Sequence, residues 1–379
     1  MVLRRLVLFG ALFALAACDP AAFGPRVQQG QPVKVALLVP GGSGDAQFDL
    51  IARDLTNAAR LAVADLDGVD IDLEVYQTGR SAQRAAQLAQ QAVADGAGII
   101  VGPLDASSAN AAAVAVAGQN VNVLSFSNNP AIAGANTFIL GNTFQNTADR
   151  LVQYGRRNGK SRYMVVSGRT PAEEVANAAV VQAIQGRGGT VVGNSQFAMS
   201  QEGVVAAVPA IADGAVASGA DALFLTSSTQ DALPLLTQLL PERGLTPNVV
   251  QYIGLTRWDI PPSALSLPGV QGSWFALPDA SATQQFRQRF VSAYGNNPHP
   301  LAGLAYDGVA AVGALVKSRG SNALTRSALT QRNGFAGASG VFRFRDNGTN
   351  QRALAVATVR NRQVVVIDPA PRRLGTAGF

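Results

Sequence analysis

Residues 33–66 read VKVALLVPGGSGDAQFDLIARDLTNAARLAVADL and contain one complete pattern of strand, loop and helix. Val33–Val39 is a short apolar run rich in branched side chains, which is typical of a buried β-strand. A glycine-rich loop follows it, and Leu50–Leu66 then has the apolar spacing of a helix that packs on one face. The stretch therefore predicts one β–α unit with a polar loop at the carboxyl end of its strand.

The same unit recurs along most of the chain, because short β-rich runs alternate with longer Ala-rich helical patterns. This alternation predicts parallel strands with helices on both faces. The expected fold class is α/β with two lobes, each a doubly wound, mostly parallel sheet flanked by helices. The expected strands are at 71–76, 98–101, 121–124, 163–166, 191–197, 222–226, 249–253, 340–344, 354–359 and 364–367, and the expected helices at 82–94, 108–117, 175–185, 204–217, 232–239, 282–294 and 303–316.

The composition excludes several classes of protein. Of the 379 residues 47% are hydrophobic and 14% are charged, with a formal net charge of +6. This balance excludes disorder for most of the chain. A single apolar run of near-membrane length, at the N-terminus, excludes a multi-pass membrane protein. Cys18 is the single cysteine and His299 the single histidine, so intramolecular disulfides and Cys/His zinc sites are excluded, and we expect no metal and no cofactor.

The N-terminus predicts export and lipidation. Arg4 and Arg5 precede a short apolar stretch, and Leu-Ala-Ala-Cys ends at Cys18, as in a bacterial lipoprotein signal peptide covering residues 1–17. We expect Cys18 to carry a lipid anchor with acyl chains such as palmitate; the alternative is a plain signal peptide. Residues 18–32 are rich in Pro, Gly and Gln and predict a tether. The expected location is the periplasm, anchored to the inner or the outer membrane, which argues against a nucleic acid partner.

Four stretches together resemble the type I periplasmic binding proteins of the leucine-binding branch. They are VALLVPGGSG with NAARLAVADL (35–66), GAGIIVGPLDASSANAAA with NVLSFSNNP (96–130), QGSWFALPD with FRQRFVSAYGNNP and LAYDGVAAVGAL (271–315), and GASGVFRFRDNGTNQRALAV (337–356). The resemblance implies two lobes over a cleft, with three crossings near Leu140–Asn142, Ala276–Pro278 and Gly334–Gly337. The implied N-terminal lobe is 33–141 plus 277–334, the C-terminal lobe is 142–276 plus 335–368, and 369–379 is an exposed tail.

Polar loops at the carboxyl ends of strands supply the expected cleft residues. Ser107, Ser108, Ser125, Ser127, Asn128 and Asn129 are the candidates on the first lobe, with helix capping and turn chemistry as the alternative reading. On the second lobe, amino-acid binders of the family pair the ligand ammonium with an acidic residue beside an aromatic one. The matching positions here are Thr256 and Thr229, so we expect a ligand other than a free amino acid, or none.

No enzyme signature stands out. Gly42-Ser43-Gly44 resembles part of a dinucleotide loop, but Gln47 replaces the third glycine and Asp45 would repel a pyrophosphate. His299 lies between two prolines, where we expect an exposed turn. The basic residues Arg150, Arg156, Arg157, Lys160 and Arg162 are expected to form a solvated face at a helix end. The protein is therefore expected to be non-catalytic.

The phrases WFALPD and YG–NP–LAGLAYD most resemble the lipoproteins known as penicillin-binding protein activators. That resemblance implies regulation of peptidoglycan synthesis through contact with a peptidoglycan synthase. The alternative is a substrate-binding lipoprotein that delivers amino acids or related small polar solutes to an ABC permease. The expected partners are thus the membrane, one of these two proteins and a small polar ligand.

Overall fold

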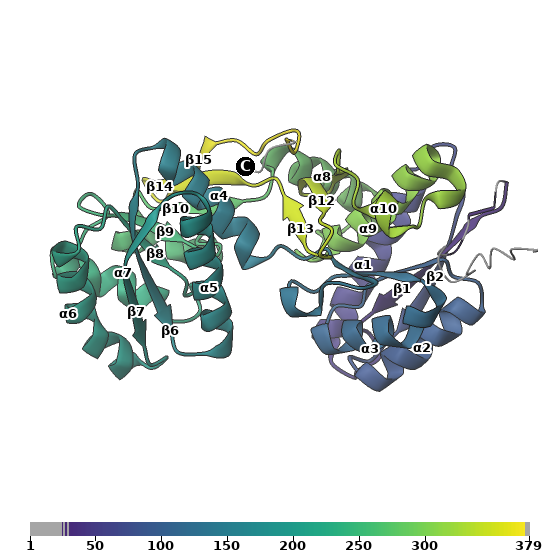
Figure 1. The fold of residues 1–379 in the computed structure, drawn as a ribbon, viewed down its shortest axis with the longest axis horizontal. Helices are drawn as coiled ribbons and strands as arrows, with labels where there is room; N and C mark the ends of the chain where they lie inside the picture. The colour runs from purple at the N-terminus through teal and green to yellow at the C-terminus, as the bar shows by residue number, and fades with distance from the viewer. Residues whose placement is uncertain (1–24, 26, 29, 376–379) are drawn as a thin grey trace, which may run out of the picture.

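The computed structural model describes residues 25, 27, 28 and 30–375, and Figure 1 shows them as two α/β lobes side by side. The predicted signal peptide, the lipidation site Cys18, most of the tether and the last four residues lie outside the described residues. Within the described residues, no helix is long and apolar enough to cross a membrane.

The first lobe contains a five-stranded parallel sheet in the order β2-β1-β3-β4-β5. In β1, Ala36 and Leu38 face helices α2 and α3, whereas Val35 and Leu37 face α1, α8 and α9, so the period-two pattern of the strand buries both faces. The strands are β1 (Val33–Val39), β2 (Ile71–Gln77), β3 (Ile99–Val101), β4 (Asn122–Ser125) and β5 (Thr137–Ile139), and the helices are α1 (Ala46–Ala64), α2 (Ala82–Ala94), α3 (Ala106–Val116), α8 (Ala280–Tyr294), α9 (Ala302–Arg319) and α10 (Arg326–Leu329).

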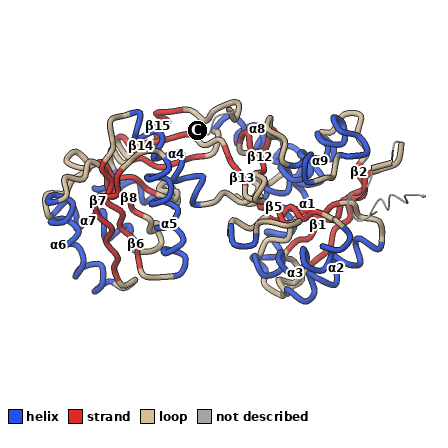
Figure 2. The backbone as a smooth tube through the Cα atoms, in the orientation of Figure 1, coloured by secondary structure: helices blue, strands red, loops and turns tan. Residues whose placement is uncertain are grey.

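The second lobe contains a seven-stranded sheet in the order β15-β14-β10-β9-β8-β6-β7, parallel except for β14 and β15. Helices α4 and α5 cover one face and α6 and α7 the other (Figure 2). The predicted α/β class with mostly parallel sheets is therefore confirmed. The strands are β6 (Arg162–Gly168), β7 (Thr190–Phe197), β8 (Ala222–Leu225), β9 (Gln251–Gly254), β10 (Trp274–Leu277), β14 (Ala355–Arg360) and β15 (Gln363–Asp368), and the helices are α4 (Phe144–Arg157), α5 (Pro171–Gly186), α6 (Gln201–Ala217) and α7 (Leu233–Glu242).

The third crossing between the lobes comes later than expected. A small antiparallel sheet of β11 (Phe335–Gly337), β12 (Gly340–Phe344) and β13 (Asn350–Arg352) belongs to the first lobe. Phe335, Phe342 and Phe344 are buried in the same core as α9 and β1. Burying these three aromatic rings in the first lobe stabilises the fold and keeps the segment there. The chain therefore enters the second lobe after Arg352 rather than at Gly334–Gly337.

Buried polar contacts hold the crossing segments. The amide of Asn350 donates to the carbonyls of Ile139 and Gly141 at 2.7 and 2.8 Å, and its oxygen accepts from Asn146 of α4 at 2.5 Å. Arg352 pairs with the fully buried Asp307 of α9 at 2.8 Å and donates to the carbonyl of Leu140. These bonds satisfy polar groups that would be costly to bury alone.

Two further expectations need correction. Arg150 is not on a solvated face: it is 7% exposed, donates to the carbonyl of Leu354 at 2.6 Å and pairs with Asp368 at 2.9 Å. The expected tail is packed in its first part, because Ala370 and Leu374 are buried against Leu277 and Val341. Leu277 and Val341 are distant from the tail in the sequence, so the local pattern could not predict these contacts.

Candidate functional site

The parallel strands of each lobe end at one edge of their sheet, which we call the carboxyl edge. In the first lobe the loops after β1, β3 and β4 lie there, and in the second lobe the loops after β6, β8 and β9. Ligands of open α/β sheets bind at such edges. Among the described residues, no hydrogen bond or ion pair joins these loops of one lobe to those of the other.

The start of α3 is the most distinctive feature of the first carboxyl edge. Asp105 is at the N-cap position, yet its side chain makes no capping hydrogen bond. Its Oδ1 instead accepts from Nε and Nη2 of Arg80 at 3.1 and 3.0 Å. The first N–H groups of α3 are therefore left without a side-chain acceptor, and a helix N-terminus of this kind favours an anion.

Arg80 and Phe48 extend this anion-binding geometry, and the sequence analysis missed both. The guanidinium of Arg80 lies 3.8 Å from the centre of the Phe48 ring, a cation–π contact. Its side chain is 42% exposed and is therefore accessible from solvent. Arg80 also has φ of +60°, an uncommon conformation for a residue with a side chain. The Gly79-Arg80-Ser81 turn before α2 was the available signal.

The serines predicted on the first lobe occupy different environments. Ser107 is exposed and Ser108 is fully buried, and the Ser108 hydroxyl has no hydrogen-bond partner within the described residues. Ser125 is fully buried and its hydroxyl donates to the carbonyl of Pro103 at 3.0 Å. Ser127 is buried and accepts from the N–H of Asn129 at 3.1 Å. Ser108 thus has unused hydrogen-bonding capacity, while Ser125 and Ser127 hold the loop.

Asn128 and Asn129 complete that loop with exposed side chains. The carboxamide oxygen of Asn129 accepts from the N–H of Ala131 at 3.0 Å and begins a short helical turn. The loop therefore places Asn128 at the edge with its side chain available.

On the second lobe, Thr229 and Thr256 both bond to backbone. The hydroxyl of Thr229 donates to the carbonyl of Ile260, and that of Thr256 lies 3.4 Å from the carbonyl of Ser227. Ser227 itself is fully buried, and its hydroxyl has no partner in the described part of the chain. Each lobe thus has one buried serine hydroxyl without a partner within the described residues, Ser108 in the first turn of α3 and Ser227 in the loop after β8.

Three carboxylates near the second edge, those of Glu173, Asp231 and Asp259, are engaged within the lobe. Glu173, which is 7% exposed, accepts from the N–H of Gly168 at 3.1 Å and from the hydroxyl of Thr226. Asp259 forms a bidentate pair with Arg257 at 2.5 and 2.6 Å, and Asp231 accepts from Ser228. Glu173 was missed in the sequence, although Thr170 and Glu173 have the spacing of a capping box. These three acids are therefore already paired, whereas Glu174 beside Glu173 is exposed and its side chain makes no hydrogen bond or ion pair within the described residues.

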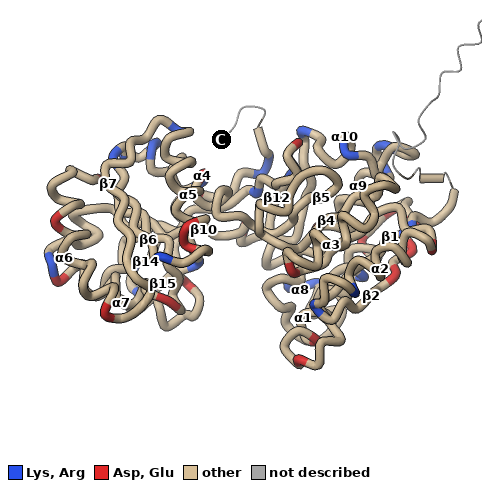
Figure 3. The backbone as a smooth tube through the Cα atoms, turned by 60° about the horizontal axis from the view of Figure 1, so that its bottom comes forward, with Lys and Arg blue, Asp and Glu red and all other residues tan. Residues whose placement is uncertain are grey.

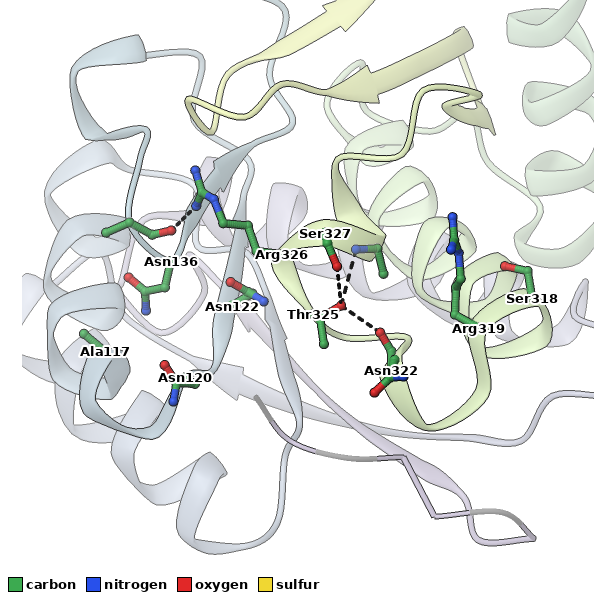
Figure 4. A pocket seen from close by; sticks show the side chains of 12 residues that line it. Ala117, Asn120, Asn122, Asn136, Ser318, Arg319, Asn322, Thr325, Arg326 and Ser327 are labelled. Atoms are coloured by element: carbon green, nitrogen blue, oxygen red, sulfur yellow. Dashed lines mark hydrogen bonds between the residues drawn. The ribbon is translucent and has the colours of Figure 1, made fainter. Parts of the chain in front are cut away.

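A large cavity lies elsewhere. It has a volume of about 970 Å³ and is lined by Asn120, Asn122, Asn136, Thr325 and Arg326, among others. Figure 4 shows it where β4 and β5 begin, at the opposite edge of the first sheet. Arg326 there donates to the carbonyls of Ala135 and Asp346. The cavity is thus separate from the carboxyl edge.

The single histidine, His299, forms hydrogen bonds with Asp54 and Leu301. His299 is half-buried rather than exposed; its N–H donates to Asp54 at 2.8 Å and its Nδ1 accepts from Leu301 at 3.2 Å. Burial lowers the pKa of His299, and the charge of Asp54 opposes that shift.

Within residues 30–375, no group of three or more His, Cys, Asp or Glu side chains could hold a metal ion.

Two α/β lobes joined by three crossing segments, with polar loops at their carboxyl edges, define a two-lobed solute-binding fold. A model of the periplasmic binding protein family matches residues 32–363, and the chain belongs to that family. A search of curated proteins found no match.

Three solved structures with the same fold are distant from this chain in sequence. A putative branched-chain amino acid ABC transporter protein from Rhodospirillum rubrum is 21% identical, with a TM-score of 0.74, and covers 89% of this chain and 100% of its own. An ABC transporter substrate-binding protein from Desulfitobacterium hafniense in complex with Leu is 18% identical, with a TM-score of 0.63 over 89% and 100% of the chains. A solute-binding protein from R. palustris in complex with benzoate is 17% identical, with a TM-score of 0.57 over 90% and 98%.

Proposed function

We propose that the protein is the non-catalytic solute-binding component of an ABC importer and that it binds a small carboxylate-bearing solute between its carboxyl edges. The observation that supports this most is the uncapped start of α3. The Asp105 side chain pairs with Arg80 instead of capping α3, so the first N–H groups of the helix have no side-chain acceptor and the Ser108 hydroxyl has no partner within the described residues. A carboxylate oxygen is the acceptor that such donors require.

The second carboxyl edge narrows the class of solute. Glu173, Asp231 and Asp259 each accept hydrogen bonds within the lobe, so a ligand ammonium would have to compete with these bonds for a carboxylate. The relative with bound benzoate shows that the fold accepts a carboxylate that has no ammonium. We therefore expect monocarboxylates without an α-ammonium to bind better than amino acids.

Thermal unfolding with a panel of monocarboxylates, half of them carrying an α-ammonium, tests this proposal. A bound solute at one hundred times its Kd should stabilise the protein by about 2.7 kcal/mol. Arg80→Gln should raise the Kd for the solute about tenfold, since it removes a charged donor. Arg84→Gln is the matched control, because Arg84 is an exposed arginine on α2. If no carboxylate shifts the unfolding of the wild type, the proposal is wrong.

Regulation of a peptidoglycan synthase is the second candidate. It draws on the resemblance to penicillin-binding protein activators and on Thr256, which matches the position of the acidic residue in the amino-acid binders of the family. In-cell crosslinking followed by mass spectrometry separates the two candidates. Recovery of a bifunctional penicillin-binding protein would favour the regulator, whereas recovery of an importer permease without a synthase would exclude it.

Both candidate functions, solute binding for an importer and regulation of a synthase, include membrane anchoring through Cys18. The family places the protein in the periplasm, and several buried acyl chains make a stable anchor. Cys18→Ser should release the protein from membranes or leave its signal peptide uncleaved. If this variant fractionates and migrates like the wild type, Cys18 is not lipidated.

A further inference from the structure

Four arginines line one cavity at the boundary between the lobes. Arg187, Arg332, Arg343 and Arg345 surround a volume of about 360 Å³, together with Gln351 and Asp346. Figure 3 shows basic segments beside β12, near the middle of the molecule. This arginine cluster shares no residue with the start of α3, and neither proposed function uses it.

Arg343 is the central member of the cluster. Within the described residues, its side chain donates hydrogen bonds to neutral groups and to no carboxylate. Its Nε donates to the Gln351 carboxamide at 2.9 Å, and its Nη1 lies 3.3–3.4 Å from the carbonyls of Gly375 and Arg332. Burial lowers the pKa of Arg343, and the charges of Arg345 and Arg332 lower it further. Like charges gathered in this way destabilise each other unless an anion lies between them.

The second lobe contributes Arg187 and one carboxylate. Arg187 follows α5, and its Nε is buried without a hydrogen bond within the described residues, 3.5 Å from Oδ1 of Asp149 on α4. The other oxygen of Asp149 lies 3.8 Å from Arg345. Both contacts are too long for good hydrogen bonds, so Asp149 compensates the two arginines incompletely.

We propose that the arginine cluster binds a small phosphate-type dianion and thereby joins the two lobes. Four guanidinium groups face two carboxylates, Asp149 and Asp346, so the cavity has an excess of positive charge that a dianion would balance. Guanidinium groups match the oxygen geometry of phosphate through paired hydrogen bonds. The cavity also has room for more than the phosphate group, which admits a phosphate monoester.

A dianion at this position couples the two lobes. Arg187 moves with the second lobe, whereas Arg332, Arg343 and Arg345 belong to segments packed on the first. An anion held by both sides stabilises the interlobe arrangement that brings them together. If a solute prefers a different arrangement, the dianion and the solute weaken each other's binding by the same factor.

Isothermal titration of the full chain with inorganic phosphate, at constant ionic strength, tests the proposal without any solute. We expect saturable binding to the wild type. Arg343→Gln and Arg332→Gln should each raise the Kd about tenfold, as expected for loss of one charged donor. Arg332 is exposed, so its replacement keeps the test valid if the Arg343 variant does not fold.

Arg319→Gln is the matched control, since it removes one exposed positive charge outside the cavity and should change the Kd less than twofold. Equal weakening by Arg319→Gln and Arg343→Gln would reduce the effect to net charge and overturn the proposal. Absence of saturable phosphate binding would also overturn it. Flotation with phosphatidylglycerol vesicles separates the sources of phosphate, because binding to vesicles without binding of free phosphate would contradict a small dianion.

Discussion

At the scale of single residues, the pair of Asp307 and Arg352 is the most deeply buried ionic contact among those described. Asp307 is fully buried and Arg352 is 7% exposed. Burial raises the pKa of Asp307, and Arg352 and the N–H of Ala338 oppose that shift. The aspartate lies in the LAYDGV stretch of α9, and the arginine ends β13 at the crossing into the second lobe.

Breaking this pair should destabilise the fold. Asp307→Asn leaves a buried guanidinium without its counter-charge, and Arg352→Met leaves a buried carboxylate, so each should cost about 3–5 kcal/mol. The double variant should cost clearly less than the sum, because neither charge remains. Urea unfolding of the four proteins measures this cycle. Strictly additive losses would show that the two side chains do not interact.

His299 gives a prediction for pH. Its pKa is lowered from the usual 6.5 by burial, so near that pH the unfolded chain binds more protons than the folded one. The stability contribution is therefore complete above pH of about 6.5 and is lost as the pH falls through the lowered pKa. His299→Gln should lose less stability than the wild type between pH of about 7 and 5. Denaturant midpoints measured across this range check it, and parallel pH profiles would contradict the role of His299.

At the scale of elements, helix α9 packs unusually close to the first sheet. A Cβ at Gly308 would lie 2.7 Å from Val101 and 3.2 Å from Leu140, and one at Gly313 would lie 2.4 Å from Leu66. The two glycines therefore allow the helix to approach β3 on one side and the end of α1 on the other. This explains in physical terms why the LAYDGVAAVGAL stretch contains them.

Gly308→Ala should destabilise the protein by about 1–3 kcal/mol through overpacking against the branched Val101. Gly186→Ala is the control, because that glycine ends α5 with nothing within 4 Å of an added Cβ. The control should be neutral or stabilising, since alanine favours the helix. Thermal unfolding of both variants gives the comparison, and a neutral Gly308→Ala would contradict close packing of α9.

The elements that the sequence predicted were those with a strong local period. Val33–Val39 and Ala82–Ala94 were predicted at their observed bounds. The pattern did not reveal β5, β10, β11 or β13, which are three or four residues long. The expected helices also omitted α4 (Phe144–Arg157). Local pattern also could not place Phe335 and Phe342 in the first lobe, because their partners lie far away in the chain.

The candidate site was predictable only in outline. Loops such as 125–129 were predictable because carboxyl ends of parallel strands share one edge. The role of Arg80 was not, since it depends on Asp105, which is 25 residues away. The same limit applies to the arginine cluster, where Arg187 and Arg343 come from different lobes.

At the scale of the whole molecule, two lobes with separate cores are joined by three crossings. The carboxyl edges do not bond to each other within the described residues, while donors such as the Ser108 and Ser227 hydroxyls lack partners on either side. A solute that satisfies both edges would favour an arrangement in which they come closer, because a ligand shifts a molecule toward the arrangement that it binds best.

The distance between the lobes is the most direct test of this account. Cys18 is the single cysteine, so in a Cys18→Ser background the substitutions Ala131→Cys and Glu174→Cys place one spin label on each lobe at exposed positions. Electron–electron dipolar spectroscopy then measures their separation with and without the carboxylate that stabilises the protein most. We predict a shorter distance with solute, lost in the Arg80→Gln variant and kept in Arg84→Gln. An unchanged distance at saturating solute would contradict binding between the two lobes.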